Sequence, residues 1–498
     1  MSSIRVTYSG LIGFVIGIIS VITGMVFTLI VTRRLTPEEF GIWAIIGSMI
    51  GYFLFAEYII SYWSTRQIAR GEPIGKTALV SSSIFSVAVI PIYISLALLM
   101  SKVQGEYLDT MLLATVLVPL TFVSQTLAGI NLGYKPHATS FGVLAFESLK
   151  IPAGLALVFF LDLGINGAII ATMIAYFGKL LIQIYFAKEK LGGYFKTEII
   201  RKWIKLSWIT LYNNISHLIW TLDVVIFPLI TASVIGVAYY AASLAVAAII
   251  GHTSMISQAL YPKLLANGSK DHVQENFVRL MYFAIPFLGI VIVFSRPALF
   301  ALNPEYIIAS EVVILLAFRA FFYTINTAFN NVLLGIETID VEENPSFLKL
   351  LKSKLFFIPT LINIHYSLYI VILVIMLFIQ SQNNVGDLEL VKTWSWISVG
   401  LSIPFAIYSG ILVKRNATFS LPLNEILKYV FSTIILIIIF IITSETMIKY
   451  EISIYDFLPG VVLQFLICSC AYIAVTYLID NKTRILLKAI VMEIMIKK

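Results

Sequence analysis

The sequence predicts an all-α integral membrane protein with about fourteen transmembrane helices. Apolar residues make up 59% of the 498, and charged residues only 12%. A soluble domain carries about 25% charged residues, so a chain this poor in charge cannot cover a water-facing surface of its size. Long uncharged runs recur along the sequence, and roughly 20 apolar residues are enough for a helix to cross a bilayer. Both observations indicate that lipid is the main solvent of this chain.

The spans follow from these runs in chain order. The runs 6–32, 77–101 and 457–479 contain no charged residue at all. They are apolar on every side, whereas the strands of a membrane barrel alternate over about ten residues. Residues 224–262 are also uncharged but too long for one crossing, so we expect a turn at Gly236. The predicted spans are 8–31, 41–63, 77–100, 109–132, 138–161, 165–187, 206–229, 234–260, 278–300, 307–334, 356–380, 393–413, 427–448 and 457–479.

The distribution of Lys and Arg predicts the orientation. If the N-terminus is cytoplasmic, 25 of the 34 Lys and Arg residues fall on the inner side, six on the outer side and three within spans. This asymmetry agrees with the positive-inside rule and places both termini in the cytoplasm. The net charge of +7 is thereby explained without a nucleic-acid partner.

The loops leave little room for a soluble domain. The longest predicted inner loops are 188–205 and 335–355, and residues 347–355 are typical of a short basic amphipathic helix. No Gly-rich phosphate loop occurs, so we expect no nucleotide cofactor. The two cysteines, Cys468 and Cys470, lie in the last predicted span and are too few for a metal cluster. We therefore expect neither a cofactor nor a metal.

A weak internal repeat predicts two lobes. Thr36 and Gly41 between spans one and two match Thr231 and Gly236 between spans seven and eight in spacing. Because the two copies are six crossings apart, they face the same side of the membrane, as in a parallel repeat. We expect a six-helix lobe over 1–200 and a second lobe over 201–390, completed by 391–415. Residues 416–498 would add helices 13 and 14 and a cytoplasmic tail.

The segment 32–44 resembles a signature of the polysaccharide transporters of the O-antigen flippase type, within the multidrug/oligosaccharidyl-lipid/polysaccharide exporter superfamily. It reads Thr-Arg-Arg-Leu-Thr-Pro-Glu-Glu-Phe-Gly-Ile-Trp-Ala and departs from the family at Thr36, where glycine is usual. The segments 163–168 and 334–340 resemble the start of the sixth span and the inner end of the tenth. A local reason exists as well, because Thr36 and Pro37 suit a capped helix start.

The resemblance implies a flippase that moves lipid-linked oligosaccharide from the inner to the outer leaflet by alternating access. The substrate would carry a polyprenyl or dolichyl tail, a phosphate or pyrophosphate, and a sugar head. Expected partners are this lipid, other membrane lipids and glycan-assembly enzymes, and the expected location is the plasma membrane. Two alternatives remain open: a membrane-embedded glycosyltransferase or polymerase that uses lipid-linked sugars, and a cation-coupled multidrug exporter.

Ionisable residues within spans are costly and usually face a cavity or a partner. Glu147 and Lys150 share a face of span five, where they can pair with each other or contact substrate. Arg34 can supply a cation at the outer mouth. Glu57 in span two and Asp223 in span seven have no cation partner in their own helices. We therefore expect these two acids to couple transport to protons or cations.

Span ten carries a polar stripe. Arg319, Tyr323, Asn326 and Asn330 fall on one helix face, and Glu311 lies nearer its edge. Such groups would lack partners against lipid, so they face another helix or a wet cavity. Arg319 can bind a phosphate, Tyr323 can stack on a sugar, and the amides can bond its hydroxyls. The alternative is structural: Arg319 pairs with Glu311, or with an acid on another span.

Overall fold

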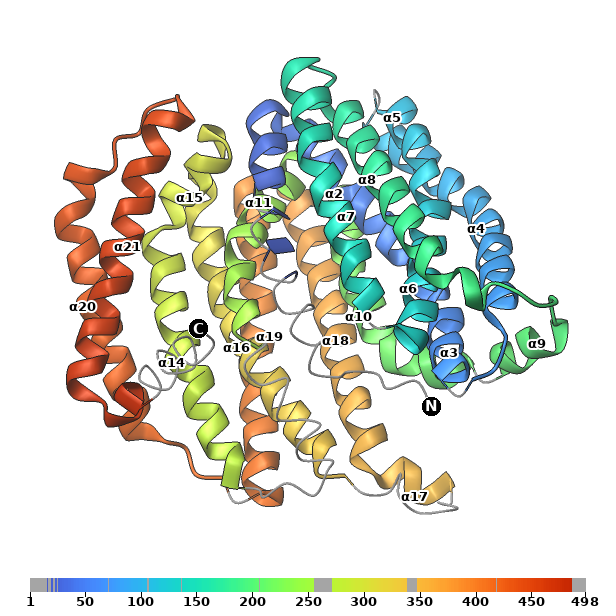
Figure 1. The fold of residues 1–498 in the computed structure, drawn as a ribbon. Helices are drawn as coiled ribbons and strands as arrows, with labels where there is room; N and C mark the ends of the chain where they lie inside the picture. The colour runs from blue at the N-terminus through green and yellow to red at the C-terminus, as the bar shows by residue number, and fades with distance from the viewer. Residues whose placement is uncertain are drawn as a thin grey trace, which may run out of the picture. The chain divides into compact units, whose positions relative to one another are not determined.

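The computed structural model describes residues 26–254, 271–337 and 347–485, apart from a few isolated positions, and some residues of 16–24. Within these ranges the regular structure is helical, and thirteen helices are long and apolar enough to cross a membrane (Figure 1). They match the predicted spans from the second to the fourteenth. The first predicted span, 8–31, lies mostly outside the described residues, of which 26–34 are helical. The prediction of an all-α membrane protein with about fourteen crossings is confirmed.

Packing divides the chain into two compact units. The first comprises Met1–Ala238 and Val374–Asp387, and the second Tyr239–Leu373 and Leu388–Lys498. The helix of the seventh span therefore packs with the six spans before it. The lobe boundaries predicted at residues 200, 390 and 415 stay predictions.

The first unit is built from helices that follow one another along the chain with short connections. Among the described residues of this unit, three interruptions occur inside the spans: the 3-10 turns η1 (Leu54–Ala56) and η2 (Ala114–Val116), and the π-helix η3 (Leu155–Phe160). The helices are α2 (Pro37–Phe53), α3 (Tyr58–Ala69), α4 (Gly75–Gln104), α5 (Leu108–Leu113), α6 (Leu117–Tyr134), α7 (His137–Gly154), α8 (Gly164–Ala187), α9 (Thr197–Lys205) and α10 (Ser207–Thr231).

Small and polar residues join the helices of this unit. Thr65 of α3 donates a hydrogen bond to the carbonyl of Gly129 in α6 at 2.9 Å. The Asn131 amide of α6 donates to the carbonyl of Gln183 in α8 at 3.0 Å, and Ser124 donates to the Gln183 side chain at 3.2 Å. Helices in lipid gain little from apolar burial, so close backbone approach and interhelical hydrogen bonds hold them together.

The start of α2 has the predicted capping geometry. The Glu39 amide donates to Thr36 Oγ1 at 3.2 Å, and the Thr36 amide donates to Glu39 Oε2 at 3.0 Å. Pro37 occupies the first helical position. Glu39 Oε1 also accepts from the amide of Ile165 at 3.5 Å, at the start of α8. Two of the sequence segments that carry the family resemblance therefore meet through this glutamate.

The second copy of the repeat lies between α10 and α11 (Ile235–Ala247). The turn is centred on Ala232, which has a φ of 54°, so the expectation of a turn at Gly236 is wrong by a few residues. Gly236 is already helical, and its amide donates to Ser233 Oγ at 3.4 Å. Ser233 therefore caps α11 as Thr36 caps α2. The spacing of the repeat had paired Thr36 with Thr231, which lies two residues earlier.

The second unit contains the remaining spans. The helix over the predicted span 278–300 begins earlier and ends at Val293, and a separate short helix follows it. The predicted amphipathic segment contains a short helix of six residues, α17 (Phe347–Lys352). The other helices are α14 (Asp271–Val293), α15 (Ser295–Leu302), η6 (Pro304–Ala309), α16 (Ser310–Gly335), α18 (Lys354–Gln382), α19 (Asp387–Asn416), α20 (Leu423–Met447) and α21 (Ile454–Ile479).

An aromatic core holds the last two spans onto α14. The ring of Tyr282 lies 5.4 Å from that of Tyr429 in α20 and 5.5 Å from that of Tyr472 in α21. The Tyr472 hydroxyl also donates to the carbonyl of Tyr282 at 2.7 Å. These buried aromatic contacts fix α20 and α21 as part of the second unit, where they lie side by side (Figure 1).

Candidate functional site

The polar stripe on α16 divides by exposure. Arg319 is only 8% exposed, whereas Tyr323, one turn further, is 49% exposed. Asn330 is buried, and Asn326 is half-buried. The four side chains thus lie on one helix but differ in their exposure to the surroundings.

Asn326 and Asn330 both contact Ser409 of α19. The Ser409 hydroxyl lies 2.7 Å from Asn326 Oδ1 and 3.3 Å from Asn330 Oδ1. One hydroxyl has a single proton, so it can donate to only one of these amides at a time. The amides therefore link α16 to α19, which is the structural role that the sequence left open for the stripe.

Arg319 lies near a histidine that the sequence analysis did not single out. His365 of α18 is buried and stacks on Phe405 of α19 with ring centroids 4.2 Å apart. The Arg319 guanidinium is close enough for its charge to act on this imidazole. A histidine within the predicted span 356–380 was the available signal. The second unit thus holds a buried cation and a buried imidazole at membrane depth.

Glu311, the acid weighed as a partner for Arg319, has another cation. Its carboxylate forms an ion pair with Lys392 Nζ at 2.7 Å, and Lys392 also pairs with Glu389 at 2.9 Å. Lys392 belongs to α19, so this contact joins the starts of α16 and α19. Sequence spacing on one helix could not reveal a partner that comes from another.

In the first unit, Glu147 is the centre of a buried cluster. Its carboxylate accepts from Ser20 Oγ at 3.0 Å and from Thr23 Oγ1 at 2.8 Å. Lys150 Nζ lies 3.0 Å from Oε2, so the predicted i, i+3 pair forms. The two hydroxyls come from the first span and were not predicted. Each carboxylate oxygen is thus bonded, as a buried charge requires.

The cluster carries more positive than negative charge. Lys150 Nζ lies 5.0 Å from the centroid of the Phe146 ring, and Lys179 Nζ of α8 lies 5.9 Å from it. Lys150 also lies over the Phe27 ring at 5.1 Å. Two lysines and one glutamate leave one net positive charge among aromatic rings. Such a group can hold a phosphate through charge and a sugar through ring stacking.

Glu57 lies where span two breaks. The 3-10 turn η1 separates α2 from α3, and Glu57 follows it directly. Its side chain is 0% exposed, and Thr126 of α6 donates to Oε1 at 2.6 Å. No described residue bonds the other oxygen, Oε2. A buried carboxyl with one unpartnered oxygen, at a break in a helix, is suited to take up a proton or cation.

Asp223 is buried on α10, where its Oδ1 accepts from the amide of Val224 at 2.8 Å. The helix α10 packs against α2, η1 and α3, so both predicted coupling acids lie on elements that are in contact. Among the described residues, no group of His, Cys, Asp and Glu side chains is arranged to hold a metal ion. Their use in coupling stays a prediction.

Arg34 is exposed and stacks on an aromatic ring. Its guanidinium carbon lies 4.0 Å from the centroid of Phe159, in the π-helix η3. This cation–π contact connects the end of the first span to the end of span five. The contact gives Arg34 a structural role, and its predicted role at the outer mouth stays a prediction.

Solved structures of membrane transporters share the multi-pass helical fold of this chain. The lipid II flippase MurJ, in an inward closed conformation, matches with a TM-score of 0.69 at 13% identity, covering 95% of this chain and 99% of MurJ. An inward-facing multidrug resistance MATE transporter of the MOP superfamily matches with a TM-score of 0.57 at 14% identity, covering 81% of this chain and 96% of its own. A MOP superfamily transporter from Pyrococcus furiosus matches with a TM-score of 0.51 at 13% identity, covering 82% and 95%.

The chain therefore has the fold of MOP superfamily transporters. No family model and no curated protein sequence matches it. At 13–14% identity the likeness establishes the fold, and the substrate has to be argued from the residues.

Proposed function

We propose that the protein is a flippase that moves a lipid-linked oligosaccharide, carried on a polyprenyl or dolichyl (pyro)phosphate, from the inner to the outer leaflet by alternating access. The observation that carries the proposal is a cation held at membrane depth in each unit: Lys150 with Lys179, both half-buried around the Phe146 ring, and the buried Arg319 of α16. A buried cation costs several kcal/mol and persists where it has a partner or a ligand. The phosphate of the carrier lipid would add to the partners that these cations already have, such as Glu147 beside Lys150.

The chemistry needs no covalent step. A sugar head and a phosphate cannot cross hydrocarbon unaided, because their polar groups would lose water without replacement. Arg319 and Lys150 bind the phosphate in the proposed cycle, while Tyr323 stacks on a sugar ring. The carrier tail stays in lipid. Asn326 and Asn330 have two roles open to them. They release Ser409 and form hydrogen bonds with sugar hydroxyls, or they keep Ser409 and hold α16 against α19.

Glu57 and Asp223 are the proposed coupling residues. Uptake of a proton or cation by the unpartnered Glu57 oxygen removes the cost of a bare charge beside the break in span two. The helix α3 continues from that break. A change in the charge of Glu57 would therefore favour either the inward-open or the outward-open arrangement of the helices.

Chain coverage favours a flippase over a multidrug exporter. MurJ covers 95% of this chain, whereas the MATE transporter covers 81%. The drug exporter remains the second candidate because it shares the fold. A glycosyltransferase or polymerase is less well supported, since the chain connects its spans by short loops and the solved structures it matches are transporters.

The proposed location is the plasma membrane, with both termini in the cytoplasm, following the 25 to 6 asymmetry of Lys and Arg. On that orientation the loops 188–205 and 335–355 are cytoplasmic. Glycan-assembly enzymes are proposed partners, because they make the substrate on the inner side and use it on the outer side.

The test is complementation in a strain that needs an exported glycan. The variant Arg319→Ala is expected to reach the membrane at the level of the unmodified protein and to lose export. Arg415→Ala, which removes an exposed arginine at the end of α19, should export normally. Loss of the Arg319→Ala protein from the membrane would assign the arginine to structure, and normal export by it would remove Arg319 from the transport path.

A further inference from the structure

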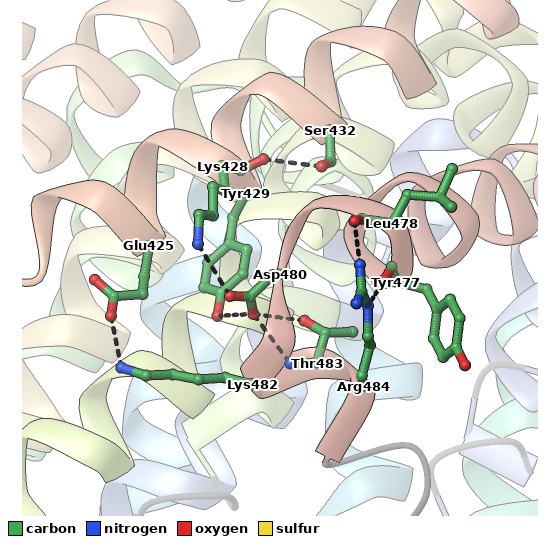
Figure 2. A network of polar contacts seen from close by, with 10 residues as sticks. All are labelled: Glu425, Lys428, Tyr429, Ser432, Tyr477, Leu478, Asp480, Lys482, Thr483 and Arg484. Atoms are coloured by element: carbon green, nitrogen blue, oxygen red, sulfur yellow. Dashed lines mark hydrogen bonds and ion pairs between the residues drawn. The ribbon is translucent and has the colours of Figure 1, made fainter.

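The end of α21 holds a polar network that the transport proposal does not use. Asp480 follows the helix directly and is only 2% exposed. Its carboxylate accepts from the amide of Thr483 at 3.0 Å and from the Thr483 hydroxyl at 2.8 Å. Lys428 and Tyr429 of α20 each bond it at 3.3 Å (Figure 2). The chain after α21 is thereby fixed against α20.

Two further contacts set the direction of this segment. Arg484 donates to the carbonyls of Tyr477 and Leu478 at 2.6 and 2.5 Å, which satisfies the free carbonyls at the end of α21. Lys482 pairs with Glu425 of α20 at 2.5 Å (Figure 2). Residues 481–485 are helical again.

A cavity of about 300 Å³ lies between this segment, α14 and α20. Arg279 and Lys482 line it with positive charge, and Val278 and Ile485 line it with apolar surface. Its lining residues lie in the second to fourth turns of α14, in the second turn of α20 and just after the end of α21. The charge distribution predicts that this end faces the cytoplasm. On that orientation the cavity lies in the inner part of these helices, where Arg279 and Lys482 are within reach of lipid headgroups.

The acids beside these cations do not close the site to an anion. Glu275 pairs with Arg279 at 2.5 Å, but both side chains are more than half exposed. Exposed ion pairs contribute little to stability, so a phosphate can displace such a partner at little cost. Lys482, which pairs with Glu425, is also more than half exposed. Around the cavity and the Asp480 network, cations outnumber acids among the described residues. The four cations are Arg279, Lys428, Lys482 and Arg484, and the three acids are Glu275, Glu425 and Asp480.

We propose that this cavity binds the phosphate group of a membrane lipid, with Arg279 and Lys482 as its donors and Val278 and Ile485 against the first atoms of the lipid tail. Arg can bind a phosphate through two parallel donors, and cations at the inner surface attract anionic lipid. The phosphate has two sources: an anionic phospholipid of the inner leaflet, or the carrier of the transported sugar. The site stands whether or not the proposed transport function holds.

The test measures lipid binding to the purified full-length protein by native mass spectrometry and by the shift in melting temperature. The probes are phosphatidylglycerol, phosphatidylcholine, undecaprenyl phosphate and inorganic phosphate at equal concentrations. Phosphatidylglycerol or undecaprenyl phosphate should bind and raise the melting temperature, and phosphatidylcholine and inorganic phosphate should not. Whichever of the two anionic lipids binds more tightly identifies the source of the phosphate group. Equal effects of phosphatidylglycerol and phosphatidylcholine, or equal protection by inorganic phosphate, would overturn the proposal.

Variants assign the binding to this cavity. Arg279→Gln with Lys482→Gln should weaken binding of the anionic lipid about 10- to 30-fold, as expected for two lost cations. The exchange Arg279→Lys with Lys482→Arg should retain most of it, which separates lost charge from a damaged fold. Lys414→Gln with Arg415→Gln, two exposed cations at the end of α19, removes the same charge elsewhere and should leave binding unchanged. Undiminished binding in the first double variant would rule out the cavity.

Discussion

Gly41, near the start of α2, lies against the backbone carbonyl of Val234, at the turn before α11. The two residues belong to the two copies of the internal repeat, and a Cβ at position 41 would overlap the carbonyl oxygen. Glycine is therefore needed at position 41 because the backbone of Val234 comes so close, and not because of the dihedral angles of Gly41 itself. This contact is the point where the repeated segments meet.

Replacing Gly41 with Ala should destabilise the protein. The added methyl group must push the turn at Val234 away, and overpacking of this kind costs about 1–3 kcal/mol. The expected result is a lower melting temperature and a lower level in the membrane. Gly47→Ala is the matched control on the same helix, because a methyl group added there would meet no other atom within 4 Å and alanine favours helix. Equal stability of the two variants would show that the contact is not tight.

The pair Glu147–Lys150 separates a structural role from a substrate role. Lys150→Met leaves a buried carboxylate without its cation, and breaking a buried pair costs about 3–5 kcal/mol. Adding Glu147→Gln should recover much of the lost thermal stability, because no bare charge remains. If Lys150 binds substrate, the double variant is stable but does not transport. A double variant that transports normally would assign the pair to structure alone.

Glu57→Gln should alter coupling while preserving the fold. The amide keeps an oxygen for the bond from Thr126 and removes the titrating group. We expect transport by this variant to lose its dependence on pH or on cations, measured as uptake rates in vesicles at several pH and sodium values. Glu445→Gln, an exposed acid near the end of α20, is the control. An ion dependence identical to that of the unmodified protein would exclude Glu57 from coupling.

Asp480 gives a pH dependence with a defined sign. Burial by itself would raise the pKa of this carboxyl, but the bonds from Thr483 and Lys428 outweigh it and hold the pKa below its usual value. A depressed pKa adds stability that is complete above the unfolded-state pKa of about 3.9 and is lost as the pH falls further. Asp480→Asn should therefore lower the melting temperature by a constant amount between pH 5 and pH 8. A difference that shrinks already from pH 8 to pH 6 would contradict this account.

Periodicity and length were sufficient to predict the spans, because an apolar run of this length has few alternatives to a helix in lipid. The capping of α2 by Thr36 was equally predictable, since capping is local in sequence. Contacts between helices were not: Ser409 with Asn326, Lys392 with Glu311, and Ser20 with Glu147 each join distant segments. A residue's spacing on its own helix says which face it occupies, not which helix lies opposite.

The polar network at Asp480 was missed for a related reason. The aspartate follows the last span and looks like an ordinary charged connector in the sequence. Its burial depends on Lys428 and Tyr429, which are about fifty residues earlier in the chain. The break in span two at Glu57 also has no sequence signal, because no proline or glycine lies at η1.

The central claim, movement of a lipid-linked oligosaccharide between leaflets, is tested most directly in reconstituted vesicles. A lipid-linked oligosaccharide with a fluorescent sugar head is placed in both leaflets, and a membrane-impermeant quencher reports the fraction exposed outside as it changes with time. We expect the purified protein to move the lipid far faster than empty vesicles do, and Arg319→Ala to fall to the rate of empty vesicles while Arg415→Ala remains active. A rate equal to that of empty vesicles for the unmodified protein, together with export of a cationic drug from the same vesicles, would contradict the claim and favour the multidrug exporter.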